Sequence, residues 1–221
     1  MTQNPERSLM LFHGSPVRVE TPLFGKGNSR NDYGLGFYCT ESRELACEWA
    51  CPTTENGYVN SYGLQTTGLA FLNLNDPSYT CLHWLAVLVK YRRFDATTPL
   101  MAEAKEFVLD RYSVDLSKFD VVSGYRADDS YFSFARAFLD NRLSLSQLQQ
   151  ALLLGELGKQ VVIRSKRAFD ALSFIDAELV RGSDWHPRRS ARDNQARAQY
   201  RNLARDTSES SVYMLDLLRG A

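Results

Sequence analysis

The segment Asp32–Thr40, with the sequence DYGLGFYCT, decides how the rest of the chain is interpreted. Gly34 and Gly36 bracket a short aromatic and apolar run, which is typical of a buried strand. The preceding segment, Thr21–Asn31, is rich in Gly and Asn and predicts a loop. The following segment, Ser42–Ala50, has helical propensity and repeats apolar residues on one face. We therefore predict a strand over Asp32–Thr40 that leads directly into a helix.

Strand and helix signals alternate along the rest of the chain without a regular βαβ rhythm. The expected strands cover Leu9–His13, Asp32–Thr40, Tyr58–Leu64, Leu69–Leu74, Phe119–Gly124, Gln160–Ile163 and Leu172–Val180. The expected helices cover Ser42–Ala50, Tyr79–Arg92, Met101–Tyr112, Ser130–Leu139 and Leu145–Gly155, with a short helix between the last two strands. This order predicts an α+β fold with small, mainly antiparallel sheets and flanking helices.

The last forty residues differ from the rest in composition. Six arginines and one acid lie within Arg188–Arg205. Arg197 and Arg201 are four residues apart, which places them on one face of a helix. That face either binds phosphate groups or is a solvated surface whose charges pair with acids elsewhere. We expect residues 1–180 to form the main domain and residues 181–221 to form a basic helical extension that docks on it.

The composition argues against several classes of protein. Lys plus Arg and Asp plus Glu both number 26, so no global field recruits a polyanion. The four cysteines have neither the spacing of a disulfide framework nor histidines at ligand spacing, so we expect reduced thiols and no metal. The N-terminus MTQNPERS has no apolar signal region, and no apolar stretch is long enough to span a bilayer. We therefore expect a cytoplasmic protein, or an effector that is delivered elsewhere.

Three of the expected strands each carry a polar or aromatic residue that could belong to a site. His13 ends the first strand in FHGS, Tyr38 lies within the second, and Gln160 begins a late one in LGKQVV. Trp49 follows Tyr38 by eleven residues, on a helix that must fold back against the Tyr38 strand. Strands far apart in sequence can converge on one cleft, so these residues predict a common site.

This order of motifs resembles the ADP-ribosyltransferase superfamily, in its histidine–tyrosine–glutamate branch. The matching features are His13-Gly14, the segment Gly34–Tyr38 and an aromatic residue eleven positions later. More narrowly, FHGS, DYGLGFYCT, ACEWA, VSGYRADD and LGKQVV resemble a bacterial ADP-ribosyltransferase-like family of unknown function, from about residue 9 to residue 180. The resemblance implies a split β-sandwich that uses NAD⁺ as a co-substrate.

The resemblance also implies roles for individual residues. Tyr38 and Trp49 would sandwich nicotinamide, Gly14 would offer its backbone to the carboxamide, and His13 and Gln160 would bind the two riboses. Further NAD⁺ contacts are expected around these positions, from Ser15, Gly36 and Phe37. Candidates for the acceptor side of the cleft are Arg126, Asp128, Arg197 and Arg201, although Asp128 is also typical of a helix N-terminus.

The sequence departs from the resembled pattern at three positions. Gln160 stands where the best-known members carry Glu, and a neutral amide can bind a ribose hydroxyl but cannot accept a proton from a nucleophile. Ala46 stands near the position where many relatives carry Ser. Gly158 replaces the first acid of the pair that grips an arginine acceptor. The amide of Gln160 favours single transfer over polymer formation, and the absence of an acid at position 158 argues against an arginine acceptor. Gln160→Glu is expected to retain NAD⁺ binding.

The leading hypothesis is a mono-ADP-ribosyltransferase that cleaves NAD⁺ and modifies a protein or nucleic acid. The resemblance implies a bacterial toxin or defence effector, with toxin–antitoxin or antiviral roles and an antitoxin as partner. Two alternatives stay open: an NAD⁺ glycohydrolase with water as the acceptor, and a catalytically silent module that binds NAD⁺ or ADP-ribose.

Overall fold

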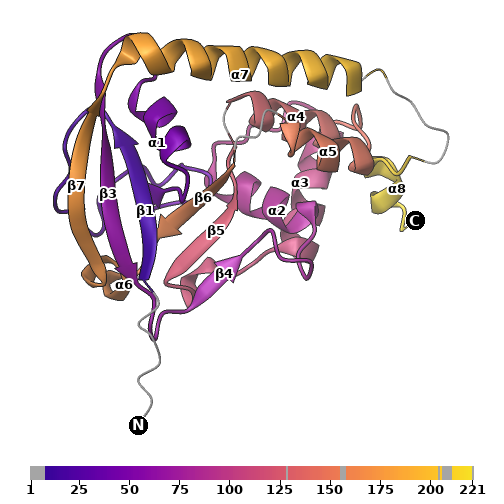
Figure 1. Ribbon diagram of the computed structural model, residues 1–221. Helices are drawn as coiled ribbons and strands as arrows, with labels where there is room; N and C mark the ends of the chain where they lie inside the picture. The colour runs from indigo at the N-terminus through magenta and orange to yellow at the C-terminus, as the bar shows by residue number, and fades with distance from the viewer. Residues whose placement is uncertain (1–7, 128, 155–157, 204, 206–210, 221) are drawn as a thin grey trace.

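The computed structural model describes residues 8–127, 129–154, 158–203, 205 and 211–220, without the side chains of 129–131. These residues form two small sheets flanked by helices (Figure 1). The strands are β1 (Ser8–Ser15), β2 (Phe37–Cys39), β3 (Gly57–Gln65), β4 (Phe71–Asn73), β5 (Val121–Tyr125), β6 (Lys159–Ile163) and β7 (Leu172–Val180). The helices are α1 (Arg43–Ala50), α2 (Cys81–Tyr91), α3 (Pro99–Tyr112), α4 (Asp129–Leu139), α5 (Leu145–Ala151), α6 (Lys166–Asp170), α7 (Gly182–Leu203) and α8 (Met214–Leu218), with a 3₁₀ turn at Leu116–Lys118.

The α+β class and the mainly antiparallel sheets expected from the sequence are confirmed. In the described part of the chain, one sheet has the order β1-β3-β7 and the other the order β2-β6-β5-β4. All neighbouring strands are antiparallel except β4 and β5. The two sheets are joined where Phe12 and Thr40 exchange backbone hydrogen bonds of 2.8 and 2.9 Å. This junction brings the end of β1 beside β2.

The prediction of an extended strand over Asp32–Thr40 was wrong in its extent, because only Phe37–Cys39 pairs in a sheet. Gly34 has a φ of 75°, which turns the chain before the strand begins. The hydroxyl of Tyr38 fixes this turn by donating to the Gly34 carbonyl at 2.6 Å and accepting from the Tyr33 N–H at 3.1 Å. Asp32 is consequently held in a loop beside β2.

The core lies mainly between the second sheet and the helices α2, α3, α4, α5 and α8. Helix α2 is apolar along most of its length, and it buries Leu82 and the run Trp84–Val89. Smaller apolar clusters fill the space between the sheets and the space between α1 and β3. Because a helix that is apolar all round belongs in a core, α2 anchors the second sheet.

Helix α1 lies unusually close to β1. A Cβ atom at Gly14 would be 2.0 Å from the Ala46 carbonyl oxygen and 2.8 Å from the Trp49 Cβ, so only glycine permits this approach. Ser42 caps the helix by accepting a hydrogen bond from the Leu45 N–H at 3.3 Å. The close contact and the cap together set the position of Trp49.

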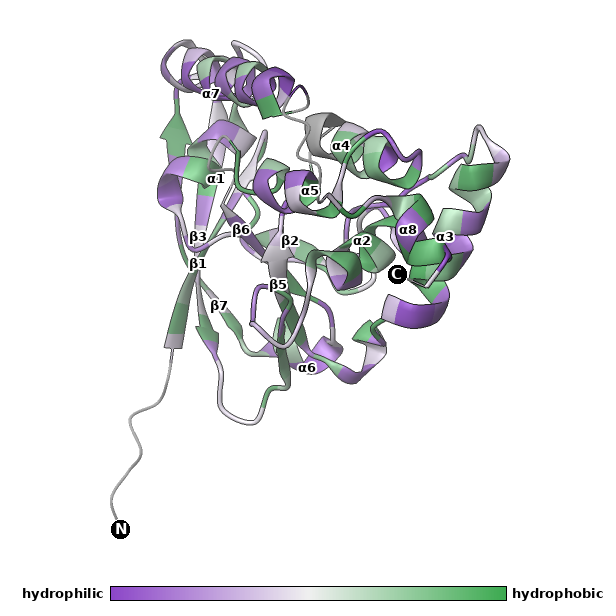
Figure 2. Cartoon of the chain, turned by 90° about the vertical axis from the view of Figure 1, so that its right-hand side faces the viewer, coloured by the Kyte–Doolittle hydropathy of each residue, from purple (hydrophilic) through white to green (hydrophobic). Residues whose placement is uncertain are grey.

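The arginine-rich segment forms helix α7, which runs across the top of the molecule in Figure 1 and is largely hydrophilic in Figure 2. Arg192 forms a buried ion pair with Glu48 of α1. Tyr200 stacks on Phe134 of α4 with ring centroids 3.8 Å apart. Beyond α7, Met214 of α8 is fully buried. The C-terminal segment therefore packs against α1 beside the first sheet and against the helices that cover the second sheet.

Cys39, Cys47 and Cys51 are buried free thiols, and Cys81 is a partly exposed one. Within the described ranges, no three His, Cys, Asp or Glu side chains gather as metal ligands. None of the described helices combines the length and the apolar character that crossing a membrane requires.

Candidate functional site

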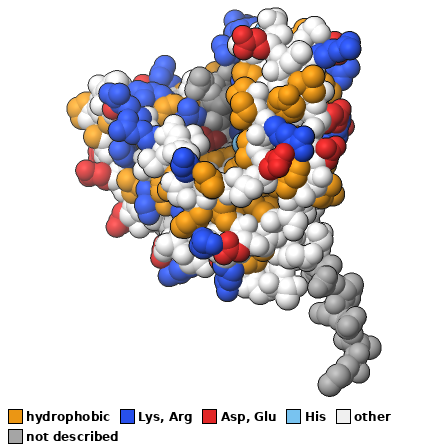
Figure 3. Space-filling model, turned by 90° about the vertical axis from the view of Figure 1, so that its left-hand side faces the viewer, with side chains coloured by type: hydrophobic (Ala, Val, Ile, Leu, Met, Phe, Trp, Pro, Cys, Tyr) orange, Lys and Arg blue, Asp and Glu red, His pale blue; other side chains and the backbone are white. Residues whose placement is uncertain are grey.

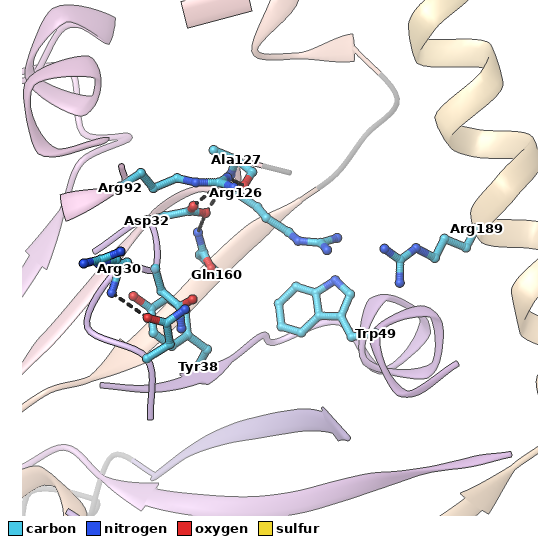
Figure 4. Close-up of a pocket in the computed structure, with 11 residues that line it drawn as sticks. Arg30, Asp32, Tyr38, Trp49, Arg92, Arg126, Ala127, Gln160 and Arg189 are labelled. Carbon is cyan, nitrogen blue, oxygen red and sulfur yellow. Dashed lines mark hydrogen bonds and ion pairs between the residues drawn. The ribbon is translucent and has the colours of Figure 1, made fainter. Parts of the chain in front are cut away.

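A cavity of about 390 Å³ opens between the loop before β2, the end of β5, and the helices α1 and α7 (Figure 4). This volume is within the range of sites for small molecules. Its lining residues come from segments far apart in the sequence: Asn28, Arg30, Asn31, Asp32, Tyr38, Trp49, Arg92, Arg126, Ala127, Gln160 and Arg189. Of the residues that the sequence singled out, Tyr38, Trp49, Gln160 and Arg126 therefore share one cavity.

Two aromatic side chains from different elements border the cavity. Tyr38 comes from β2, and burial raises the pKa of its phenol, so the hydroxyl stays protonated. Trp49 comes from α1, and the Arg126 guanidinium carbon lies 5.0 Å from the centroid of its rings. The Trp49 Nε1 is buried and has no hydrogen-bond partner among the described residues. The cavity wall therefore offers flat apolar surface next to an unused donor.

Gln160 is 4% exposed and its side chain is tightly held. Its Nε2 donates to Asp32 Oδ2 at 2.7 Å and to the Tyr125 carbonyl at 3.3 Å. Asp32 also accepts from the Ala127 N–H at 2.8 Å and from Arg92 Nη1 at 3.3 Å. Burial raises the pKa of Asp32, while the hydrogen bonds from Ala127 and Gln160 and the charge of Arg92 act in the opposite direction. The cavity thus contains a carboxylate directly beside the amide of Gln160.

His13 is not among the residues that line the cavity. Its Nδ1 donates to the Tyr38 carbonyl at 2.7 Å, and its ring packs on Phe37 with centroids 4.4 Å apart. Burial lowers the pKa of His13, which favours the neutral ring. His13 consequently fixes the backbone of Tyr38 and keeps its Nε2 as an acceptor.

The remaining predicted NAD⁺-binding residues also lie outside the lining. Gly14 faces α1 at the close approach described above. Ser15 is buried and bonds to the Val17 carbonyl and to the Asn60 amide. A Cβ at Gly36 would lie 2.5 Å from Val162 Cγ1, so this glycine lets the chain pass close to β6.

The acceptor-side candidates separate into three groups. Arg126 lines the cavity, Arg197 and Arg201 are exposed on α7 away from its lining, and Asp128 lies outside the described residues. Helix α7 instead contributes Arg189, which points toward Trp49 and Arg126 in Figure 4. The arginines that the sequence singled out by their four-residue spacing, Arg197 and Arg201, do not include Arg189.

Sequence reasoning also missed Asp32 and Arg92. Asp32 begins the segment Asp32–Thr40. The only sequence signal for it was an acid two residues before the glycine at which the chain turns. Arg92 follows the apolar helix α2 as its C-cap, where a cation is expected on helix-dipole grounds alone.

Positive charge predominates in the lining of the cavity. Four arginines face one carboxylate, so the lining favours an anionic ligand. Figure 3 shows one face hollowed near its upper centre, with Lys and Arg side chains gathered beside the hollow. Arg192 does not contribute, because Glu48 neutralises it.

The fold and the site define an α+β protein with an arginine-rich cavity at the junction of two small sheets. The chain belongs to the family described as "Protein of unknown function (DUF3990)", whose model matches residues 9–174. No curated protein and no solved structure matched the chain. The matched residues include Tyr38, Trp49 and Gln160, whereas Arg189 lies beyond them.

Proposed function

We propose that this protein cleaves NAD⁺ at the nicotinamide–ribose bond and transfers the ADP-ribose to a macromolecule. The observation that carries this proposal is that Tyr38, Trp49 and Gln160, from β2, α1 and β6, line one cavity. The resemblance to ADP-ribosyltransferases assigns nicotinamide and ribose contacts to these three positions. NAD⁺ is the co-substrate, and the reaction as proposed requires no metal.

The proposed reaction breaks the bond between ribose C1′ and the nicotinamide nitrogen. The electron pair leaves with nicotinamide as a neutral ring, and the acceptor atom bonds to C1′ while its proton passes to solvent. The transition state resembles an oxocarbenium ion, so the protein must mainly hold and bend the dinucleotide. Tyr38 and Trp49 supply stacking surface, worth about 0.5–1.5 kcal/mol per aromatic pair.

The charged residues of the cavity suit the rest of the dinucleotide. The guanidinium groups of Arg126 and Arg189 are suited to the diphosphate, because charge-assisted contacts to phosphate oxygens are strong. The Gln160 oxygen is suited to accept a hydrogen bond from the nicotinamide ribose. A neutral amide at this position favours one transfer per acceptor rather than polymer formation.

We further propose a polyanionic acceptor, in the context of a bacterial toxin or defence effector. A second cavity of about 420 Å³ shares Arg30 and Arg92 with the first and is also lined by Lys90, Arg93 and Lys105. Clustered cations of this kind bind phosphodiester chains in a salt-dependent manner. This local cluster supports a nucleic-acid acceptor even though the whole chain is neutral.

The test is incubation of the protein with NAD⁺ labelled on the adenylate side, with and without RNA, DNA and cell extract. Label on a macromolecule supports the transferase. Free ADP-ribose indicates an NAD⁺ glycohydrolase, and intact, bound NAD⁺ indicates the silent module that Gln160 suggests.

A matched pair of tryptophan variants controls the test. Trp49→Ala removes a cavity wall, whereas Trp185→Ala removes a half-buried indole on α7 outside the cavity. We expect Trp49→Ala to lose nicotinamide release and NAD⁺ binding, and Trp185→Ala to retain both. Equal behaviour of the two variants would refute the assignment of the cavity.

A further inference from the structure

The amide of Gln160 has a single possible orientation. Both of its N–H groups are engaged, one by Asp32 Oδ2 at 2.7 Å and one by the Tyr125 carbonyl at 3.3 Å. The Tyr125 carbonyl is an obligatory acceptor that also receives the Tyr33 hydroxyl at 2.7 Å and Trp84 Nε1 at 3.1 Å. Rotating the amide would set its oxygen against two acceptors, which a buried site does not tolerate.

Asp32 is itself fixed in place. The Ala127 N–H and Arg92 Nη1 donate to its carboxylate at 2.8 and 3.3 Å, so both oxygens are occupied by protein donors. Each carboxylate oxygen therefore already accepts at least one hydrogen bond from the protein, and Oδ2 accepts two. The effect of Asp32 on the cavity passes through Gln160.

We propose that Asp32 is a positioning residue that turns the Gln160 oxygen toward the cavity, where it accepts a hydrogen bond from a ribose hydroxyl. The inference rests on the proposed function, because it deepens the role of the same site. Where the resembled enzymes carry Glu, one carboxylate provides both the acceptor atom and the negative charge. Here Gln160 provides the acceptor atom, and Asp32 provides the charge that polarises and orients the amide. A hydrogen bond to an ionised partner is roughly twice as strong as a neutral one.

The pair changes what a glutamate at position 160 would do. Gln160→Glu on its own places a second carboxylate at hydrogen-bond distance from Asp32, and two such groups cannot both ionise. Exchanging both residues, as Asp32→Asn with Gln160→Glu, restores a donor facing a carboxylate. The exchange leaves the Ala127 N–H without its carboxylate acceptor and sets the new carboxylate against the Tyr125 carbonyl, so the restoration is only partial.

The test measures NAD⁺ affinity by calorimetry for the two single variants, the double variant and the exposed control Asp176→Asn. We expect each single variant to weaken NAD⁺ binding about tenfold, which corresponds to one lost buried hydrogen bond, so Gln160→Glu retains binding as expected from the sequence but with reduced affinity. The double variant should bind NAD⁺ more tightly than two independent losses predict, which together amount to a weakening of about a hundredfold. The KM for NAD⁺ should follow the same pattern more closely than kcat. A double variant as weak as the sum of the two single variants would overturn the inference.

A second measurement needs no NAD⁺. In a ¹H–¹⁵N spectrum, the side-chain NH₂ pair of Gln160 is assigned by its loss in Gln160→Glu, and the exposed Gln199 is the internal control. We expect the Gln160 pair to exchange with solvent about tenfold more slowly than the Gln199 pair, because both protons are bonded and buried. Asp32→Ala, which removes the acceptor oxygen that Asp32→Asn would keep, should reduce this protection even though the bond to Tyr125 remains, and unchanged protection would overturn the positioning role.

The two measurements fail in different ways. Absence of NAD⁺ binding in the parent protein would refute the proposed function and leave the amide exchange to decide the orientation of Gln160. NAD⁺ binding with amide exchange that is insensitive to Asp32 would refute the inference alone.

Discussion

The ion pair between Arg192 and Glu48 is expected to clamp helix α7 onto helix α1. Arg192 donates to Glu48 Oε2 through Nε at 2.8 Å and again through Nη2. The two side chains are only 14% and 10% exposed. Removing one partner of a buried pair typically costs about 3–5 kcal/mol, because the other charge remains buried without compensation. We take the lower end for Arg192→Met, about 3 kcal/mol of unfolding free energy.

A double-mutant cycle measured by urea unfolding tests this magnitude. Glu48→Met with Arg192→Met replaces the pair by apolar side chains, which is often neutral, so the double variant should be more stable than Arg192→Met alone. The coupling energy should be about 2 kcal/mol. Arg43 and Glu178 form the matched exposed pair, with side chains 40% and 51% exposed.

Because exposed pairs contribute about 0–1 kcal/mol, Arg43→Met is expected to have little effect. The reasoning is refuted if Arg192→Met costs no more than Arg43→Met, or if the cycle gives less than about 0.5 kcal/mol of coupling. In either case the pair with Glu48 would not engage Arg192 fully, and its charge would be available to a phosphate ligand.

Three further predictions concern other parts of the molecule. Gly14→Ala places a Cβ 2.0 Å from the Ala46 carbonyl, and overpacking of this kind costs about 1–3 kcal/mol or more; a thermal melt as stable as that of the parent would contradict it. The hydrogen bond from Arg167 lowers the pKa of the buried Asp120 to about 2. The contribution of this carboxylate to the free energy of unfolding is therefore fully present above about pH 4 and disappears as the pH falls through about 2. Asp120→Asn should therefore cost about 1 kcal/mol at pH 7 and only a small fraction of that at pH 2, and a pH-independent difference in urea midpoints would contradict this. Reversing the charges of Arg197 and Arg201 should weaken RNA or DNA binding and reduce its salt dependence; unchanged binding isotherms would assign that face to solvent.

The sequence was sufficient to predict the fold class, because each element has its own local signal. The apolar run of α2 and the turn residues around the strands specify elements without reference to the rest of the chain. The extent of β2 was predicted wrongly because the turn at Gly34 depends on a hydroxyl supplied by Tyr38, a contact that no local pattern reveals.

The candidate site was predictable only in part. Tyr38, Trp49 and Gln160 were identified because their order along the chain resembles a known arrangement. Asp32 and Arg189 were missed because their significance is a matter of position. One is an acid beside a buried amide, and the other is one arginine among six that happens to face the cavity. Residues that act through tertiary contacts leave little trace in the pattern of a single sequence.

The most direct test of the central claim is nicotinamide release from NAD⁺ by the purified protein, followed by chromatography with the adenylate label traced in parallel. We expect release by the parent protein and by Trp185→Ala, none by Trp49→Ala, and label on a macromolecular acceptor. Intact NAD⁺ after long incubation with every acceptor class would contradict the account, whether or not the protein binds it.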